Sequence, residues 1–160
     1  MKRKFQLSGG QLLKKCYLLI ISLIIIFETY NFLIQNQHKQ AANESFRYNL
    51  SESDSCFGVD YTKFHEEDKI YYYMKAASNL HTALYILPFT SYKDNQDLKN
   101  VLSRLYLSIT LHSTPESNNR LNAFNEKEHD IFMCLHYINI NPNDKNNCKA
   151  LAKIAEDIGY

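Results

Sequence analysis

Glutamate and histidine side chains at metal-binding spacing are the first candidates for chemistry in this chain. Glu126 and His129 have the Glu-x-x-His spacing of carboxylate-bridged di-iron bundles, but such a centre needs a second copy of the motif and two further carboxylates. His65 is followed by Glu66 and Glu67 without the second histidine of a zinc-binding His-Glu-x-x-His helix. We interpret both stretches as solvated helix starts. The sequence therefore predicts no metal, no cofactor, no catalytic residue and no enzymatic activity.

Three of the four cysteines follow the apolar N-terminal stretch, at Cys56, Cys134 and Cys148. In an oxidising compartment they are expected to pair, which leaves one over. We favour a disulfide between Cys134 and Cys148, because it would join two consecutive helices across a short turn and stabilise the fold by about 3 kcal/mol. Pairing of Cys56 with either of them stays open. A reactive thiol would need a lowered pKa and a nearby base, and no motif supplies them.

Two features of the first predicted domain helix are candidates for binding a protein partner. Tyr71, Tyr72 and Tyr73 are consecutive, and consecutive helical residues point about 100° apart, so at least one must be exposed. Exposed tyrosines are typical of interfaces, although the three could also wrap a small core or face the membrane. Glu66 and Glu67 give the helix an acidic start that suits a basic partner; the alternative is an ordinary stabilisation of the helix dipole.

These side chains must be positioned by elements that begin with residues 16–34, which are predicted to form a transmembrane signal-anchor. The apolar run reaches the length of about 20 residues that a membrane span needs. Glu28 lies toward one end, where a carboxylate reaches the headgroups at lower cost. Five basic residues and no acid precede it, so the positive-inside rule makes residues 1–15 a cytoplasmic tail. We expect a single-pass inner-membrane protein with its C-terminal domain in the periplasm.

Two other interpretations of this apolar run stay open. It has the h-region of a signal peptide, so the chain could be secreted to the periplasm after cleavage. The nearest small residues, Ala41 and Ala42, lie far beyond the h-region for a cleavage site. The run could also be the buried helix of a soluble protein.

The rest of the chain is expected to be all-α, with a bundle of about four helices following the anchor. Residues 35–55 are polar and predict a stalk, and residues 56–160 predict the extracytoplasmic helical domain. Helices are expected over residues 62–86, from Asp94 to about residue 112, over 125–138 and over 144–158, with a strand at 132–140 as the competing interpretation. The inward face of the first of these helices is predicted to carry Ile70, Met74, Ala77, Leu80 and Leu84.

Charge excludes one class of partner. The formal net charge is only +1, and most of the clustered basic residues precede the apolar run. Binding to nucleic acid generally requires a basic surface. We therefore expect no nucleic-acid partner and attribute the basic cluster to membrane topology.

One stretch resembles a known family. Residues 132–137, Phe-Met-Cys-Leu-His-Tyr, and the closing helix with Leu151 and Ala152 are similar to the C-terminal signature of small immunity proteins of the Tai/Rap type. Those proteins protect bacteria against type VI secreted peptidoglycan amidases. The resemblance implies a small helical periplasmic protein with paired cysteines that blocks its amidase as an oligomer. It assigns no inhibitory residue.

Together these features predict a membrane-anchored periplasmic binding protein with a protein partner. One form of this hypothesis is an immunity protein that blocks a secreted cell-wall hydrolase. The alternative is a single-span subunit or regulator of a phage lysis or secretion assembly, which the predicted topology fits equally well.

Overall fold

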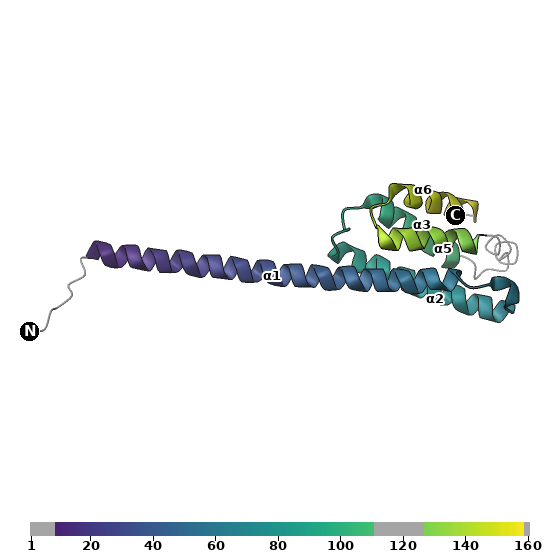
Figure 1. Cartoon of the computed structure of the whole chain (residues 1–160), viewed down its shortest axis with the longest axis horizontal. Helices are drawn as coiled ribbons and strands as arrows, with labels where there is room; N and C mark the ends of the chain where they lie inside the picture. The colour runs from purple at the N-terminus through teal and green to yellow at the C-terminus, as the bar shows by residue number, and fades with distance from the viewer. Residues whose placement is uncertain (1–8, 111–126, 159–160) are drawn as a thin grey trace, which may run out of the picture. The chain divides into compact units, whose positions relative to one another are not determined.

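The structure is a computed structural model that describes residues 9–110 and 127–158, and no strand occurs within these ranges. The predicted all-α class, an apolar N-terminal helix followed by a helical bundle, is confirmed. The chain divides into two units, residues 1–38 and 39–160. In chain order the elements are α1 (Gly9–Phe57), η1 (Tyr61–Lys63), α2 (Glu66–Ile86), η2 (Leu87–Phe89), α3 (Gln96–Thr110), α5 (Glu128–Ile140) and α6 (Lys145–Asp157) (Figure 1).

The first unit is the apolar part of α1. Most of its large side chains, such as Leu18, Ile24 and Phe27, are more than half exposed, and only Ile21 and Ile34 are partly buried among those described. Among the described residues α1 is the one helix long and apolar enough to cross a membrane, by length and composition. A helix that is apolar on every side is stable only inside a large core or in lipid.

The second unit is a bundle in which the last part of α1 is a structural member. Phe46, Leu50 and Phe57 recur on one helix face and are fully buried. The predicted polar stalk is therefore wrong from residue 39 onward, because this segment is helical and belongs to the folded unit. Its sequence looks polar because only one face in the helix is apolar, and that face packs into the core.

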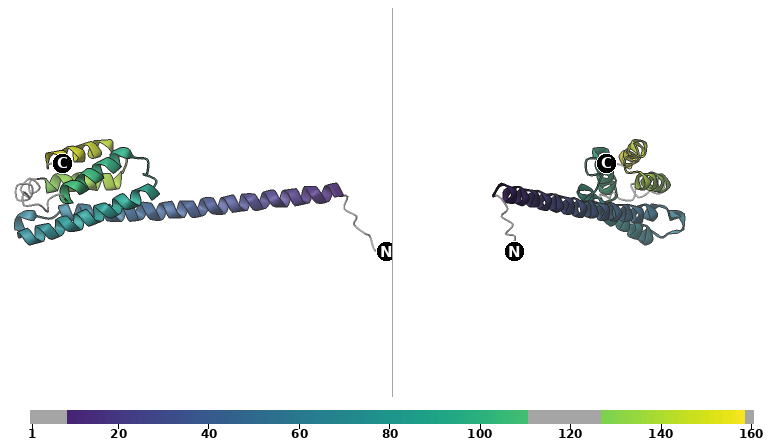
Figure 2. Two further views of the ribbon diagram at one scale, coloured as in Figure 1. Left: turned by 180° about the vertical axis from the view of Figure 1, so that it is seen from behind. Right: turned by 60° about the vertical axis from the view of Figure 1, so that its left-hand side comes forward.

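Helices α3 and α6 pack side by side (Figures 1 and 2). Helix α3 also packs against α2, and α6 also packs against α5. Both show the predicted amphipathic pattern. Asp144, at the predicted start of the last helix, caps α6, since its carboxylate accepts from the backbone N–H groups of Asn146 and Asn147. For α3 the predicted cap, Asp94, is wrong by one residue: the Asn95 side chain accepts from the Leu98 N–H at 3.0 Å.

Helix α5 settles the ambiguity between helix and strand at residues 132–140. The segment is helical, with Ile131, Cys134, Leu135 and Ile138 buried at spacings of three and four. Burial of a face with this period is possible only for a helix, although the sequence also alternates like a strand. The predicted start at residue 125 lies outside the described residues.

Helix α2 faces the core with small side chains. Ala76, Ala77 and Ala83 are buried beside Leu80 and Tyr73, and the Ser53 hydroxyl of α1 donates to the Ala76 carbonyl at 3.2 Å. Of the predicted inward residues, Ala77 and Leu80 are buried and Leu84 is half-buried, but Ile70 and Met74 are exposed. The sequence pattern favours the large residues, whereas the small ones fill much of the side of α2 that faces the core.

Candidate partner-binding surface

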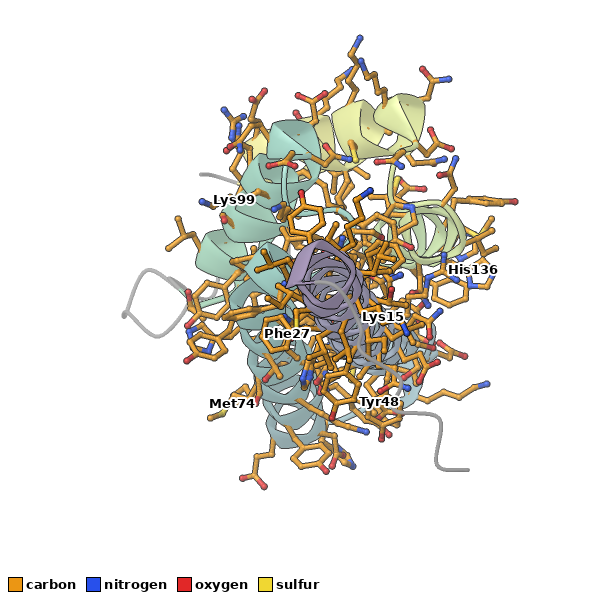
Figure 3. The ribbon with its side chains drawn as sticks, turned by 90° about the vertical axis from the view of Figure 1, so that its left-hand side faces the viewer. Lys15, Phe27, Tyr48, Met74, Lys99 and His136 are labelled. Atoms are coloured by element: carbon orange, nitrogen blue, oxygen red, sulfur yellow. The ribbon has the colours of Figure 1, made fainter. Side chains whose placement is uncertain are left out.

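The outer face of α2 combines exposed apolar and acidic side chains. Tyr71, Met74 and Tyr85 are 64%, 68% and 74% exposed, and Ile70 is about half exposed. Helical periodicity of about 100° per residue brings these positions within one arc of the helix surface. We call this arc the α2 outer face; Figure 3 shows Met74 at the edge of the bundle. Large apolar side chains gathered on one face of a folded unit are typical of interaction surfaces.

Acidic residues begin the same helix. Glu66, Glu67 and Asp68 are all exposed in the first turn, where the positive end of the helix dipole stabilises them. Only Glu66 has a cation nearby, the Lys69 ammonium at 3.4 Å. Glu67 points to the same side of α2 as Tyr71 and Met74 by helical spacing, so an apolar partner with a basic flank would match this face in charge.

The three consecutive tyrosines have three different environments. Tyr71 is exposed, which confirms the prediction that at least one of them must be. Tyr72 is half-buried and stacks on Phe64 with ring centroids 5.0 Å apart. Tyr73 is buried in the core, so its prediction as a partner-binding residue is wrong. Of the predicted surface residues, the structure leaves Tyr71, Glu66 and Glu67 fully available and Tyr72 only in part.

Tyr73 instead belongs to a buried polar cluster. Its hydroxyl bonds to Glu128 Oε1 of α5 at 2.6 Å, and its ring stacks on Tyr61 with centroids 5.2 Å apart. Tyr61 donates its own hydroxyl to the Cys56 carbonyl. Burial raises the pKa values of both tyrosines and of Glu128, since desolvation disfavours every charged form. The first bond joins α2 to α5, and Tyr61, bonded to the end of α1 and stacked on Tyr73, links that end to α2.

A second buried carboxylate, Asp54, lies at the contact of α1 with α5. Asp54 is only 4% exposed, and its Oδ2 lies 3.7 Å from Nδ1 of His136. The His136 side chain, labelled in Figure 3, is half exposed. Burial raises the pKa of Asp54 to about 6, although His136 and the Ser55 N–H act in the opposite direction. Sequence reasoning missed this pair because Asp54 falls in the segment interpreted as a stalk.

The cysteines are free thiols in this structure, so the predicted disulfide between Cys134 and Cys148 is not seen. Both are buried, on α5 and α6. Burial raises the pKa of both thiols, that of Cys148 to about 11, with the neighbouring Cys134 contributing. Raised pKa values disfavour the nucleophilic thiolate. Pairing in an oxidising compartment stays a prediction that mass spectrometry of the oxidised protein can test.

Near these thiols, a cavity of about 360 Å³ opens between α5 and α6. Its apolar lining includes Met133, Cys134 and Ile154. Two lysines and two aspartates surround it, so it has no net charge to select a charged ligand. Within the described ranges, no group of three or more histidine, cysteine or acidic side chains is arranged to hold a metal ion.

Comparison of the chain with protein-family models, with curated proteins and with solved structures gave no match. The resemblance at residues 132–137 thus stays a prediction. In the structure this stretch lies in α5, where Cys134 and Leu135 are buried and His136 and Tyr137 are exposed.

Proposed function

We propose that the protein is a membrane-anchored binding protein, with residues 16–34 in the lipid and the second unit on the extracytoplasmic side. The observation that carries this proposal is the exposure of nearly all the large apolar side chains in the described part of the first unit, of which only Ile21 and Ile34 are partly buried. Burying one such side chain contributes about 1.5–3 kcal/mol, so leaving a dozen of them in water would be strongly unfavourable. Lipid is the environment that suits a helix apolar on all sides.

The orientation follows from charge. Lys14 and Lys15 directly precede the apolar segment, and the sequence before them is basic. The positive-inside rule keeps such a segment in the cytoplasm and sends the second unit across the membrane. In a bacterium this unit would lie in the periplasm.

The α2 outer face supports binding of a protein partner in that compartment. Its exposed aromatic and apolar side chains supply contact area, and Glu66 and Glu67 beside them favour a partner with a basic surface. A secreted cationic cell-wall hydrolase has this chemistry, and it is the partner class of the immunity-protein hypothesis. The alternative, a subunit or regulator of a lysis or secretion assembly, would use the same face.

Topology is tested first, on the full chain in membranes. Alkaline carbonate should leave the protein in the membrane pellet, because a spanning helix resists extraction. With Cys16→Ser as background, Ser51→Cys offers an exposed thiol in the second unit. A membrane-impermeant maleimide added outside spheroplasts should label it without lysis. Release by carbonate, or labelling only after lysis, contradicts the proposal.

Partner binding is tested on the full chain in detergent, using as probe a purified hydrolase encoded by a neighbouring gene. Met74→Asp removes apolar area from the centre of the α2 outer face and should weaken binding at least tenfold, since central contacts dominate interfaces. Tyr48→Asp is the matched control, because Tyr48 is equally exposed on α1. Absence of binding by the wild-type chain rejects the immunity hypothesis, and a neighbouring endolysin gene favours the lysis alternative.

A further inference from the structure

The turn between α2 and α3 presents apolar side chains outward on a fixed frame. In η2, Leu87 is only 1% exposed, whereas Pro88 is exposed and Phe89 is 65% exposed. The Thr90 hydroxyl donates to the Leu87 carbonyl at 2.7 Å and accepts from the Tyr92 N–H at 3.0 Å, and these two bonds fix the turn. The fold of its own turn therefore holds Phe89 away from the core.

The same turn is attached to the last part of α1. Oδ1 of Asn43 accepts from the backbone N–H of Ser91 at 2.8 Å and from the Ser91 hydroxyl at 3.1 Å. The ring of Tyr92 lies against Phe46 with centroids 5.9 Å apart, and Arg47 Nη2 donates to the Tyr92 hydroxyl at 3.1 Å. These contacts fix where the turn lies along α1.

Helix α2 runs back along α1 toward this turn. Near the middle of α2, the Ala76 carbonyl accepts from the Ser53 hydroxyl, whereas beyond the end of α2 Ser91 bonds to Asn43. The end of α2 and η2 thus lie beside the earlier residues of the part of α1 that belongs to the second unit (Figure 1). Asn43 follows Ile34, the last residue of the proposed lipid segment, by nine residues of helix, which are about 14 Å long.

We propose that Tyr85, Pro88 and Phe89, which we call the η2 surface, dock on the lipid headgroups beside the anchor. This inference rests on the proposed membrane anchor. Tyr85 is 74% exposed and lies in the last turn of α2, four residues before Phe89. The headgroup layer extends about 5–8 Å beyond the hydrocarbon on each side. Spanning helices tilt by about 20° on average, and such a tilt lowers one side of the attached unit toward the bilayer.

Two features favour lipid as the occupant of the η2 surface. Because the anchor already holds the second unit at the membrane, docking is intramolecular, so even a small apolar contact is sufficient. Exposed aromatic side chains such as Tyr85 and Phe89 also suit the membrane interface. The two segments that the turn joins, residues 39–47 and 91–95, carry three basic and two acidic side chains, so their charge does not repel an anionic bilayer. Tyr85 ends the α2 outer face, whose earlier residues stay available to a protein partner.

The test is tryptophan fluorescence, because the chain contains no tryptophan of its own. Phe89→Trp and, as a second reporter, Tyr85→Trp are introduced singly into the full chain. Each variant is reconstituted in vesicles of phosphatidylcholine and phosphatidylglycerol whose acyl chains are brominated near the headgroup, since bromine quenches tryptophan on contact. The matched control is Tyr71→Trp, because Tyr71 is 64% exposed and lies about 21 Å of helix before Tyr85. Both reporters should be quenched roughly three times more strongly than the control, because only they reach the headgroup level.

A fourth variant, Phe27→Trp in the lipid segment, separates this inference from the anchor itself. Lipids brominated deep in the acyl chain should quench it strongly if α1 spans the bilayer. If Phe27→Trp is quenched and the two reporters are quenched no more than Tyr71→Trp, docking of the η2 surface is wrong while the anchor stands. If the reporters emit at shorter wavelength without being quenched, protein covers this surface and lipid is the wrong occupant. Absence of quenching at Phe27→Trp overturns the anchor and the docking together.

Discussion

The two ends of α1 differ in composition, and in each the burial is the reverse of what the composition suggests. Residues 16–34 are the most apolar part of the chain, yet nearly all of their large side chains are exposed. Residues 46–57 are far more polar, yet Phe46, Leu50 and Phe57 are fully buried, together with Ser53 and Asp54. The same helix is thus exposed where it is apolar and buried where it is mixed.

The difference shows that pattern, more than mean hydropathy, decides where a helix segment belongs. A helix with one apolar face can join a water-soluble core, because its other face remains hydrated. A helix that is apolar on all faces has no side to offer water, so it requires lipid or a very large core. Buried polar residues of the second unit such as Ser53 and Asp54 are tolerated because each of these two has a partner.

The largest test of this contrast makes one substitution at each end of α1. Phe46→Ala should lower the free energy of unfolding of the second unit by about 3–5 kcal/mol, because it opens a cavity in a packed core. Phe32→Ala, at an exposed position in the first unit, should change it by less than about 0.5 kcal/mol. Urea denaturation of the full chain in detergent measures both. Equal losses would mean that the two ends of α1 are not distinct environments.

The parts of the fold predicted from sequence are those with a strong local signal. The stripe of Leu98, Val101, Leu102 and Leu105 has helical period in the sequence and is buried in α3, and α6 begins within one residue of its predicted start at residue 144. The apolar run predicted a helix of membrane-spanning length. In each case a handful of neighbouring residues contain all the information.

The predictions that the structure contradicts share a different cause: each concerns a residue whose burial depends on residues far away in the chain. Residues 35–55 look like a stalk in the sequence because their polar residues far outnumber the few side chains that pack into the core. Tyr73 could not be told from Tyr71 without knowing that Glu128 lies beside it. Ile70 and Met74 were expected inside, whereas the alanines of α2 fill that place. Only the packed structure shows which face of a helix has a neighbour.

The second test uses Asp54, a carboxylate that is buried in the second unit. Asp54 has its pKa raised from 3.8 to about 6, so the folded state binds the proton more tightly than the unfolded state. Its contribution to stability is therefore full below pH 4 and is lost as the pH rises through about 6. Asp54→Asn should match the wild type near pH 4 and exceed it by up to about 3 kcal/mol at pH 7.5.

Urea denaturation between pH 4 and 8 measures this difference. The groups that face Asp54 are His136 on α5 and Glu52 on α1, so both remain in place in the variant. Asp60→Asn is the control, because the Lys63 ammonium and the Thr62 hydroxyl hold the pKa of Asp60 down to about 2. That control should give no gain at neutral pH. A difference between Asp54→Asn and the wild type that does not vary with pH would show that Asp54 is not desolvated.

The neighbouring tyrosines of α2 give the third test, with an identical change on the two sides of one helix. Tyr73→Phe removes the hydroxyl that bonds Glu128 Oε1 and leaves a buried carboxyl group without that partner. It should destabilise the second unit by about 1–3 kcal/mol. Tyr71→Phe, at an exposed position, should be neutral within about 0.5 kcal/mol. Thermal unfolding of both variants is sufficient, and a larger effect at Tyr71 would contradict the assignment of inner and outer faces.

The smallest expected effect on stability is that of an ion pair between two helices of the bundle whose side chains are exposed. Arg104 of α3 contacts the Glu156 carboxylate of α6, and both side chains are about half exposed. Water and salt screen such pairs, so a double-mutant cycle with Arg104→Met and Glu156→Gln should give a coupling of less than about 1 kcal/mol. The coupling should fall further in 1 M salt, where the Debye length is about 3 Å. A coupling as large as that of Tyr73 with Glu128 would mean that the exposure of two side chains does not indicate how strongly they interact. The contrast between the two ends of α1, which is drawn from exposure, would then lose its physical basis.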